Sequence, residues 1–384
     1  MYFSSEQQSV RFLHTGDLHL DSPFSGLSAK KSEERRRELR ETFSRLTAYV
    51  RENAVDLVLI AGDVFDCEYV TPSTARLLID EFASCTRAKF VISPGNHDPY
   101  TQDSLWASDR LPENVFVFST EALGSFVFPE LNTAVYGWAF LSDTLAASPL
   151  AGRHIEEPDR LNLICAHADF GVPLSKYAPL TAADLSAFGA QYAALGHKHI
   201  PTSPTAVGER TLMAYCGCPE GRSFDEPGRG GFFLCDAKRG ERGWQITTER
   251  VEIARRRYES ETVDLTGVDS QIEAARRIKA VVEQKGYGED TALRVTFTGA
   301  TPPDFAVPKQ ADGSALGLYS LELADRTAPV FDARYLEKDL SVRGELYRSL
   351  LPRLTSGTPE ERAIAARALR MGIAALQGED ITNL

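Results

Sequence analysis

The stretch Leu57-Val58-Leu59-Ile60-Ala61-Gly62-Asp63-Val64-Phe65-Asp66 decides how this chain folds. It begins as a short apolar run, which is typical of a strand that is buried on both faces. Gly62 then allows the backbone to turn sharply, so Asp63 stands at the carboxyl end of the strand. Open α/β sheets bind their ligands at this end of their strands. The stretch therefore predicts an α/β domain with a functional carboxylate at the rim of a sheet.

Four other stretches place His, Asp or Asn just past an apolar run. They are Thr15-Gly16-Asp17-Leu18-His19, Pro94-Gly95-Asn96-His97-Asp98, Ala166-His167 and Leu195-Gly196-His197-Lys198-His199. Five of the seven histidines lie in these stretches. A single histidine after a strand is usually a hydrogen-bonded structural residue, and this is our interpretation of His14 and His154. Five such histidines beside carboxylates instead predict a metal site in which Asp63 is shared by two ions.

The predicted ligands mix imidazole nitrogens with carboxylate and amide oxygens. This mixture suits Mn²⁺, Fe²⁺ or Zn²⁺, and affinity alone does not choose among them. Two such ions about 3.5–4 Å apart would clamp a phosphate, bind the attacking water and lower its pKa. One carboxylate can give an oxygen to each ion, which is the role we expect for Asp63. The pattern therefore indicates hydrolysis of a phosphate ester.

The composition limits the classes of protein that fit. With 384 residues, of which 43% are hydrophobic and 25% charged, the chain is long enough for more than one domain with its own core. No apolar run reaches the roughly 18 residues of a membrane span, and residues 1–8 lack the features of a signal peptide. Six scattered cysteines, Cys67 among them, show no zinc-ribbon spacing, so we expect a cytoplasmic protein without a membrane association. A net charge of −12 argues against a general nucleic-acid coat, although bound cations would reverse the local field at an active site.

Strand and helix patterns alternate through the first 250 residues. Strands are expected at 10–14, 57–61, 89–93, 115–118, 125–128, 133–138, 162–165 and 192–195. A helix is expected at 32–53, and Thr71-Pro72 and Thr181 carry the capping signals of two more. Residues 211–253 are rich in β formers and glycine, which predicts hairpins that complete a second sheet. Together these elements predict two packed sheets flanked by helices.

The run Arg35-Arg36-Arg37 on the first helix has two interpretations. It could contact DNA, or it could form a solvated face. Glutamates at 33, 34, 38 and 41 stand three or four residues away from these arginines, which favours ion pairs along one exposed face. We therefore expect the arginines to be solvated.

After residue 257 the composition shifts. A strand at 261–265, a helix at 270–285 and a strand at 292–298 form a small β-α-β unit, and helices are expected at 333–354 and 359–376. This divides the chain into domains at 1–255, 256–317 and 318–384. Apolar residues recur along both tail helices: Leu336, Leu340, Leu346, Leu350, Leu354, Ile364, Leu369, Ile373 and Leu376. They fit either a partner-docking surface or a helical pair that packs on its own domain, and both interpretations stay open.

Taken together, the five stretches resemble the motifs of the calcineurin-like metallophosphoesterases over about the first 200 residues. The resemblance implies an α/β fold, a four-layer α/β-β/α sandwich, with a dinuclear site at its rim. It also implies which residues hold each ion. One ion is assigned to Asp17, His19, Asp63 and His199, and the other to Asp63, Asn96, His167 and His197.

A narrower resemblance, to the YhaO-type branch of the SbcD-like DNA repair exonucleases, rests on residues 17–24 and 217–225. The β-α-β unit resembles the capping domain of those nucleases. The resemblance implies a Mn²⁺-dependent DNA exonuclease in double-strand break repair, whose C-terminal helices dock an SbcC-like coiled-coil ATPase; a homodimer stays open. This chain has Asp66 at a position where some relatives carry His, and its residues 166–169 match the family motif only at His167. Strand preference and exonuclease versus endonuclease cleavage are therefore open.

Two other functions compete with the nuclease. One is a phosphodiesterase or phosphatase for small nucleotides or phosphoproteins, and the β-α-β unit favours a polymer over these substrates. The other is a non-catalytic subunit that only docks an ATPase. The complete ligand set argues against that, because loss of catalysis would leave these positions free to change.

His97 and Asp66 are the predicted catalytic pair. Successive residues of an extended loop point in opposite directions, so Asn96 should face a metal ion and His97 the substrate. We expect His97 to stabilise or protonate the leaving group and not to bind metal. The family pattern places Asp66 beside it, where a carboxylate would raise the pKa of the histidine and fix its ring. The alternative for Asp66 is a residue that caps a turn.

Overall fold

The computed structural model describes residues 9–66, 70–302, 305–329 and 333–376. The first eight residues and Cys67, on which the prediction of the compartment partly rests, lie outside them. The chain divides into two compact units, one ending at Arg257 and the other beginning at Tyr258. This division lies two residues beyond the predicted boundary at 255, and the boundary predicted at 317 stays a prediction.

The first sheet of unit 1 is built around β2 (Leu57–Ile60), the strand of the deciding stretch. In spatial order its strands are β12 (Gly243–Asp264), β11 (Gly228–Gly240), β1 (Ser9–Thr15), β2, β3 (Lys89–Ile92) and β4 (Val115–Val117). The strands β1 to β4 are parallel, and β11 runs antiparallel to β1. All four residues of β2 are buried, as its continuous apolar run predicts.

The second sheet has the spatial order β5-β6-β7-β8-β10-β9. Its strands are β5 (Gly124–Phe128), β6 (Thr133–Gly137), β7 (Leu161–His167), β8 (Tyr192–Gly196), β9 (Thr205–Val207) and β10 (Thr211–Tyr215). The prediction that residues 211–253 complete this sheet is wrong for β11 and β12. The reason is that β11 is apolar on both faces: Phe233 and Cys235 face one core and Phe232 and Leu234 another, so it lies inside the first sheet.

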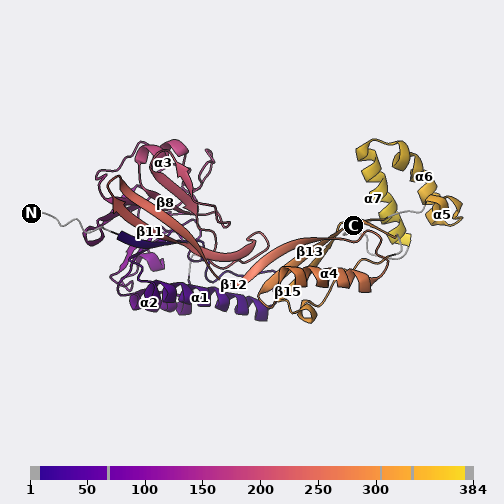
Figure 1. Ribbon diagram of the computed structural model, residues 1–384, viewed down its shortest axis with the longest axis horizontal. Coiled ribbons are helices and arrows are strands. Elements are labelled where there is room, and N and C mark those ends of the chain that lie inside the picture. The colour runs from indigo at the N-terminus through magenta and orange to yellow at the C-terminus, as the bar shows by residue number, and fades with distance from the viewer. Residues whose placement is uncertain (1–8, 67–69, 303–304, 330–332, 377–384) are drawn as a thin grey trace, which may run out of the picture. The chain divides into compact units, whose positions relative to one another are not determined.

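Three cores separate four layers, so the predicted α/β-β/α sandwich is confirmed. Helices α1 (Ala29–Glu52) and α2 (Pro72–Ser84) pack on the outer face of the first sheet, the two sheets pack on each other, and α3 (Ala182–Phe188) packs on the second sheet. Figure 1 shows α1 and α2 on one side of the sheets and α3 on the other. Alternate residues of β2 serve two cores, since Val58 and Ile60 face the helices while Leu57 and Leu59 face the second sheet. Short 3₁₀ turns occur at Leu105–Ala107 and Pro129–Leu131.

One part of the arginine prediction is wrong. Arg36 and Arg37 pair with Glu33 and Glu41 on an exposed face, as expected. Arg35 instead lies on the side of α1 that faces the sheet and is 0% exposed. A helix turns about 100° per residue, so three consecutive arginines cannot share one solvated face.

Unit 2 begins within β12 and contains α4 (Gln271–Lys285), β13 (Thr291–Thr298) and β15 (Ser320–Asp325). The predicted β-α-β unit is present, and β15 extends its sheet by pairing in parallel with β13. A short pair, β14 (Ala300–Thr301) and β16 (Ala328–Pro329), and a 3₁₀ turn at Gly313–Leu316 complete this part.

The C-terminal helices are α5 (Ala333–Lys338), α6 (Val342–Ser356) and α7 (Pro359–Leu376). The single helix predicted at 333–354 is wrong, because Asp339 Oδ1 accepts a hydrogen bond from the Ser341 N–H and turns the chain between α5 and α6. Leu336, Leu369 and Ile373 are buried together between these helices. Among all described residues, no helix has the length and apolar character to cross a membrane.

Candidate metal centre

The residues at five strand ends meet at one edge of the two sheets. They come from the ends of β1, β2, β3, β7 and β8, and comprise Asp17, His19, Asp63, Asn96, His97, His167, His197 and His199. Four of them are at most 1% exposed: Asp17, His19, Asp63 and His167. Buried polar side chains need partners, and here the partners are the other side chains of the set and backbone groups of the same loops.

The first group of ligand atoms belongs to Asp17, His19, Asp63 and His199, and all these atoms lie within 4.8 Å of one another. The closest pair is His19 Nε2 and His199 Nε2, which are 3.0 Å apart. This is the set that the resemblance assigned to one ion.

The second group forms around His167. Its Nε2 lies 2.9 Å from Asn96 Oδ1, 3.1 Å from His197 Nδ1 and 3.4 Å from Asp63 Oδ2. Asp63 Oδ2 also lies 3.8 Å from His19 Nε2 in the first group. Asp63 therefore lies close to the imidazoles of both groups.

These spacings fit bound divalent ions. Ligand atoms that surround one ion at about 2.1 Å, at right angles to one another, lie about 3 Å apart. Two imidazole–imidazole separations, of 3.0 and 3.1 Å, and the 2.9 Å separation between His167 Nε2 and Asn96 Oδ1 have this value. Both groups combine nitrogen and oxygen ligands. The residues present therefore fit two divalent ions side by side.

Backbone conformation also marks this edge. Asp17, His19, Asp63 and His197 have φ angles of 50°, 44°, 50° and 99°. Non-glycine residues rarely adopt positive φ, and such strained residues gather at functional sites. Gly62, with φ 87°, precedes Asp63, and a side chain there would collide with the His167 ring. Glycine is required at that position by both its conformation and its neighbour.

Asp98 holds two of the loops together. Its carboxylate accepts hydrogen bonds from the N–H groups of Asp63, Val64 and Gly95, at 3.0, 2.9 and 2.7 Å. Burial, together with the nearby charge of Asp63, raises the pKa of the Asp98 carboxyl well above its ordinary value. Sequence patterns assigned no role to Asp98 beyond its place in a motif, because its partners are backbone groups.

The predicted pair of His97 and Asp66 is in contact. His97 Nδ1 lies 2.9 Å from Asp66 Oδ1, and 47% of the His97 side chain is exposed. The hydrogen bond to Asp66 raises the pKa of His97 above its ordinary value. Burial alone would raise the pKa of the Asp66 carboxyl, but hydrogen bonds from His19, His97 and a serine outweigh burial and hold it well below the usual range. Asp66 is thus part of the centre through its side chain.

Asp66 has further partners that the sequence did not predict. It accepts a hydrogen bond from Ser22 Oγ at 2.6 Å, and it lies 3.3 Å from His19 Nδ1. Arg222 Nη1 reaches the same carboxylate at 3.4 Å. Asp66 therefore contacts both the exposed His97 and the buried His19.

Arg222 and Glu226 are the site residues that the sequence analysis missed. Glu226 Oε1 lies 2.8 Å from His199 Nδ1 and accepts a hydrogen bond from Arg222 Nη2 at 2.7 Å. Burial raises the pKa of the Glu226 carboxyl, but hydrogen bonds from His199 and Arg222 outweigh it and lower the pKa to about 2. The sequence signal that could have identified them is an arginine within the motif 217–225 followed four residues later by a glutamate.

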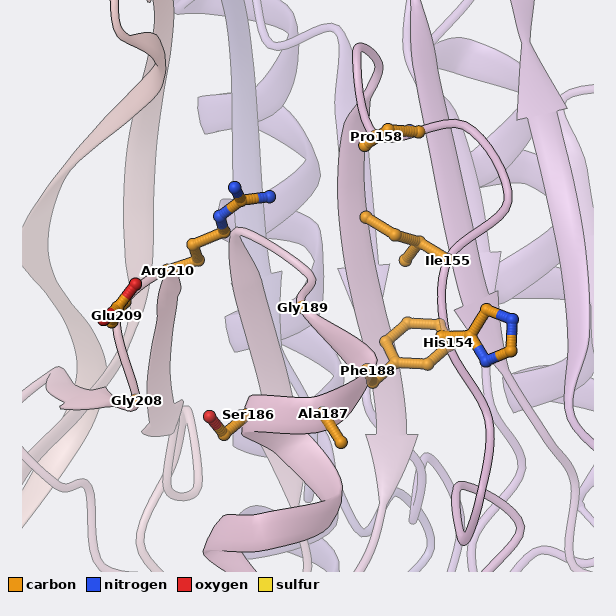
Figure 2. A pocket seen from close by; sticks show the side chains of 10 residues that line it. All are labelled: His154, Ile155, Pro158, Ser186, Ala187, Phe188, Gly189, Gly208, Glu209 and Arg210. Atoms are coloured by element: carbon orange, nitrogen blue, oxygen red, sulfur yellow. The ribbon is translucent and has the colours of Figure 1, made fainter.

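The two histidines set aside as structural lie away from the centre. His14 is buried, with Nδ1 3.0 Å from Tyr192 Oη and Nε2 3.1 Å from the Leu195 carbonyl. His154 lines a hollow of about 510 Å³, together with segments 186–189 and 208–210 (Figure 2). These segments precede parallel strands, so the hollow lies at the amino ends of the strands, opposite the edge at which the candidate metal centre lies.

Comparison with known proteins agrees with this geometry. Residues 10–201, which contain all five stretches, match the family described as calcineurin-like phosphoesterase. The chain is 27% identical over 307 residues to the uncharacterized metallophosphoesterase YhaO of Bacillus subtilis, covering 76% of this chain and 72% of the relative. It is 25% identical over 366 residues to the DNA double-strand break repair protein Mre11 of Methanopyrus kandleri, covering 87% and 75%. It is 27% identical over 284 residues to one of the subunits of the nuclease SbcCD of Bacillus subtilis, covering 62% and 68%. The chain belongs to the calcineurin-like phosphoesterase family.

Proposed function

We propose that the protein is a metal-dependent phosphodiesterase that acts on DNA as an exonuclease in double-strand break repair. The observation that carries the proposal is the pair of ligand groups that share Asp63, with His97 and Asp66 beside them. Hydrolysis of a phosphate ester follows from the site itself. DNA as the substrate follows from the relatives, one named as a break repair protein and another as a nuclease subunit.

In this proposal each ligand group holds one divalent ion, and Mn²⁺ is the ion we propose. Asp17, His19, Asp63 and His199 hold the first, and Asp63, Asn96, His167 and His197 the second. When bound, two such ions polarise a phosphate ester and acidify a water molecule.

The chain itself supplies the proton for the leaving group. Asp66 accepts the Nδ1–H of His97, which leaves Nε2 of the exposed ring to face the substrate. The imidazolium form donates its Nε2 proton to the departing oxygen of the phosphodiester, and solvent then reprotonates the ring. Water is the nucleophile, so no covalent intermediate between enzyme and substrate forms.

The C-terminal helices supply the proposed partner site. Val342 on α6 and Ile364 on α7 are 69% and 61% exposed, although other apolar residues of these helices are buried together. Leu340, which the sequence placed on a helix, lies in the turn between α5 and α6 and is 95% exposed. Exposed apolar helix faces are the kind that pack on a partner helix. We propose that they dock an SbcC-like coiled-coil ATPase.

Hydrolysis of a panel of substrates tests the function. Purified protein with Mn²⁺ is given linear duplex DNA, closed circular duplex DNA, bis-p-nitrophenyl phosphate, cyclic nucleotides and a phosphopeptide. The proposal expects linear DNA to be degraded from its ends, closed circles to be spared, and all turnover to stop with EDTA. Hydrolysis of small esters without any cleavage of DNA would establish the small-substrate phosphodiesterase instead, and no turnover of any phosphate ester would establish a non-catalytic subunit.

A further inference from the structure

Segment 218–226, between β10 and β11, connects the metal centre to the buried interior of unit 1. Its Arg222 and Glu226 contact residues of the centre, whereas its Glu220 points into the protein and is 3% exposed. The segment contributes none of the proposed metal ligands.

Glu226 determines how His199 presents its nitrogens. A carboxylate only accepts hydrogen bonds, so the 2.8 Å contact between Glu226 Oε1 and His199 Nδ1 requires the proton on Nδ1. The Nε2 lone pair then faces the ligand atoms of Asp17, His19 and Asp63. A carboxylate that binds the far nitrogen of a metal-ligating histidine fixes its tautomer and its orientation.

Arg222 holds Glu226 in place. Its Nε and Nη2 donate to Glu226 Oε1 at 3.2 and 2.7 Å, and its backbone N–H donates to the other carboxylate oxygen at 2.6 Å. Arg222 Nη2 also lies 3.0 Å from His199 Nδ1, but both groups are donors, so both donate to Glu226 and not to each other. Arg222 Nη1 also contacts Asp66. One guanidinium therefore links Glu226, which contacts His199, to Asp66, which contacts His97.

Glu220 fixes the other end of the segment. Its carboxylate accepts hydrogen bonds from the backbone N–H groups of Arg255 and Arg256 on β12, at 2.5 and 2.9 Å, and from Thr42 Oγ1 on α1 at 2.7 Å. The segment is thereby attached to α1 and to the part of β12 where unit 1 ends.

Buried arginines complete this attachment. Arg35 donates to the Gly221 carbonyl at 2.6 Å and pairs with Glu38 and Glu220. Arg256 Nη2 reaches Glu38 Oε1 at 2.5 Å. Loss of one member of a buried ionic group leaves another charge without compensation, so the group tolerates few arrangements.

We propose that segment 218–226 positions the metal centre, with Glu226 and Arg222 orienting His199 and with Glu220 linking that orientation to the path of β12 at Arg255 and Arg256. The inference rests on the proposed function only in taking His199 as a metal ligand. Because β12 continues to Asp264 in unit 2, a change in its path at this point would alter the affinity for the ion that His199 holds.

Mn²⁺ titration calorimetry on the full chain tests the inference without any substrate. Glu226→Gln keeps an acceptor oxygen for His199, and Glu226→Ala removes it. Affinity for one of the two ions should fall about 10-fold in the first variant and about 100-fold in the second, while the other ion binds as in the wild type. Glu220→Gln should weaken the same ion about 2- to 30-fold.

The matched control for Glu220 is Glu81→Gln. Glu81 on α2 also bonds to α1, through Thr47 at 2.5 Å and Arg51 at 3.1 Å, but has no connection with segment 218–226. The Glu81→Gln variant should bind both ions with affinities within about twofold of the wild type, even if its unfolding midpoint changes. If Glu220→Gln does not fold, Thr42→Val removes one donor to Glu220 without removing a charge.

The outcomes separate the two proposals. Wild-type affinity in Glu226→Ala, or an equal loss at both ions, overturns the positioning role. Equal affinities in Glu220→Gln and Glu81→Gln overturn the link to β12. A wild-type protein that binds no Mn²⁺ overturns both this inference and the proposed function. The expected affinities without any cleavage of DNA overturn the nuclease alone.

Discussion

The metal centre of unit 1 and the C-terminal helices of unit 2 depart from the usual burial pattern in opposite ways. At the centre, four carboxylate and imidazole side chains are at most 1% exposed, and their polar atoms face one another. In the C-terminal region Leu340, which lies in the turn between α5 and α6, is 95% exposed. Burying polar groups costs free energy unless a partner compensates, and exposing apolar groups forgoes the gain of burial. In our proposals cations complete the first arrangement and another protein completes the second, so the two regions should respond to different substitutions.

The largest effect is expected from Asp63→Asn. An amide lacks the charge and the second carboxylate oxygen that a shared ligand needs, so both ions should be lost. Hydrolysis should be abolished, so the loss should exceed the roughly 10²–10⁴-fold that removal of a proton donor costs. Metal content and the rate on bis-p-nitrophenyl phosphate measure this. The matched control is Asp236→Asn, which removes a carboxylate paired with Arg11 away from the centre. A variant that keeps two tight ions and its full rate would contradict the shared role.

His97→Asn should come next. With the ions retained, loss of the proton donor should lower the rate on DNA by about 10²–10⁴-fold. The loss should be much smaller on p-nitrophenyl esters, because p-nitrophenolate departs without a proton. Single-turnover rates on both substrates, with metal content as the control, measure the difference. An equal loss on both would place His97 in binding or in water activation.

A smaller effect is expected from Asp66→Asn, and it should depend on pH. Asp66 raises the pKa of His97, and a general acid works only while protonated. The rate on DNA therefore falls as pH rises through the pKa of His97, and the variant should lose activity at lower pH than the wild type. The loss at the optimum should stay below about 10²-fold. A pH–rate profile at saturating Mn²⁺ tests this, and an unshifted alkaline limb would rule out the pair.

The smallest effect on hydrolysis is expected in unit 2. Leu340→Glu combined with Ile364→Glu changes side chains that are exposed, so stability should change by no more than about 0.5 kcal/mol per site and basal hydrolysis by less than about twofold. Binding of the ATPase should be lost, as measured by co-purification. Ile272→Glu on α4, which is 70% exposed, is the control outside these helices. Complex formation that survives the double variant would show that the helices pack only on their own unit.

The sequence predicted that these residues come together, and it predicted the fold in outline. Asp17 and Asp63 follow strands, and His167 ends one, whose apolar runs are visible in the sequence, and parallel strands bring their carboxyl ends to one edge. The hairpin region was the main error. An apolar strand such as β11 fits either sheet, and only its antiparallel pairing with β1 decides between them.

The sequence by itself determined which polar residues gather at the centre and the four-layer fold, because both rest on local patterns of strand, turn and polar residue. Only the tertiary structure decided that Arg35 is buried, that Asp66 contacts both His19 and His97, and that Glu226 orients His199. Each of these contacts joins residues that are far apart along the chain, and the 3.4 Å pair of buried Arg35 with Glu220 joins residues 185 positions apart. Neither spacing nor periodicity encodes such pairs, because they depend on which faces of the packed layers meet.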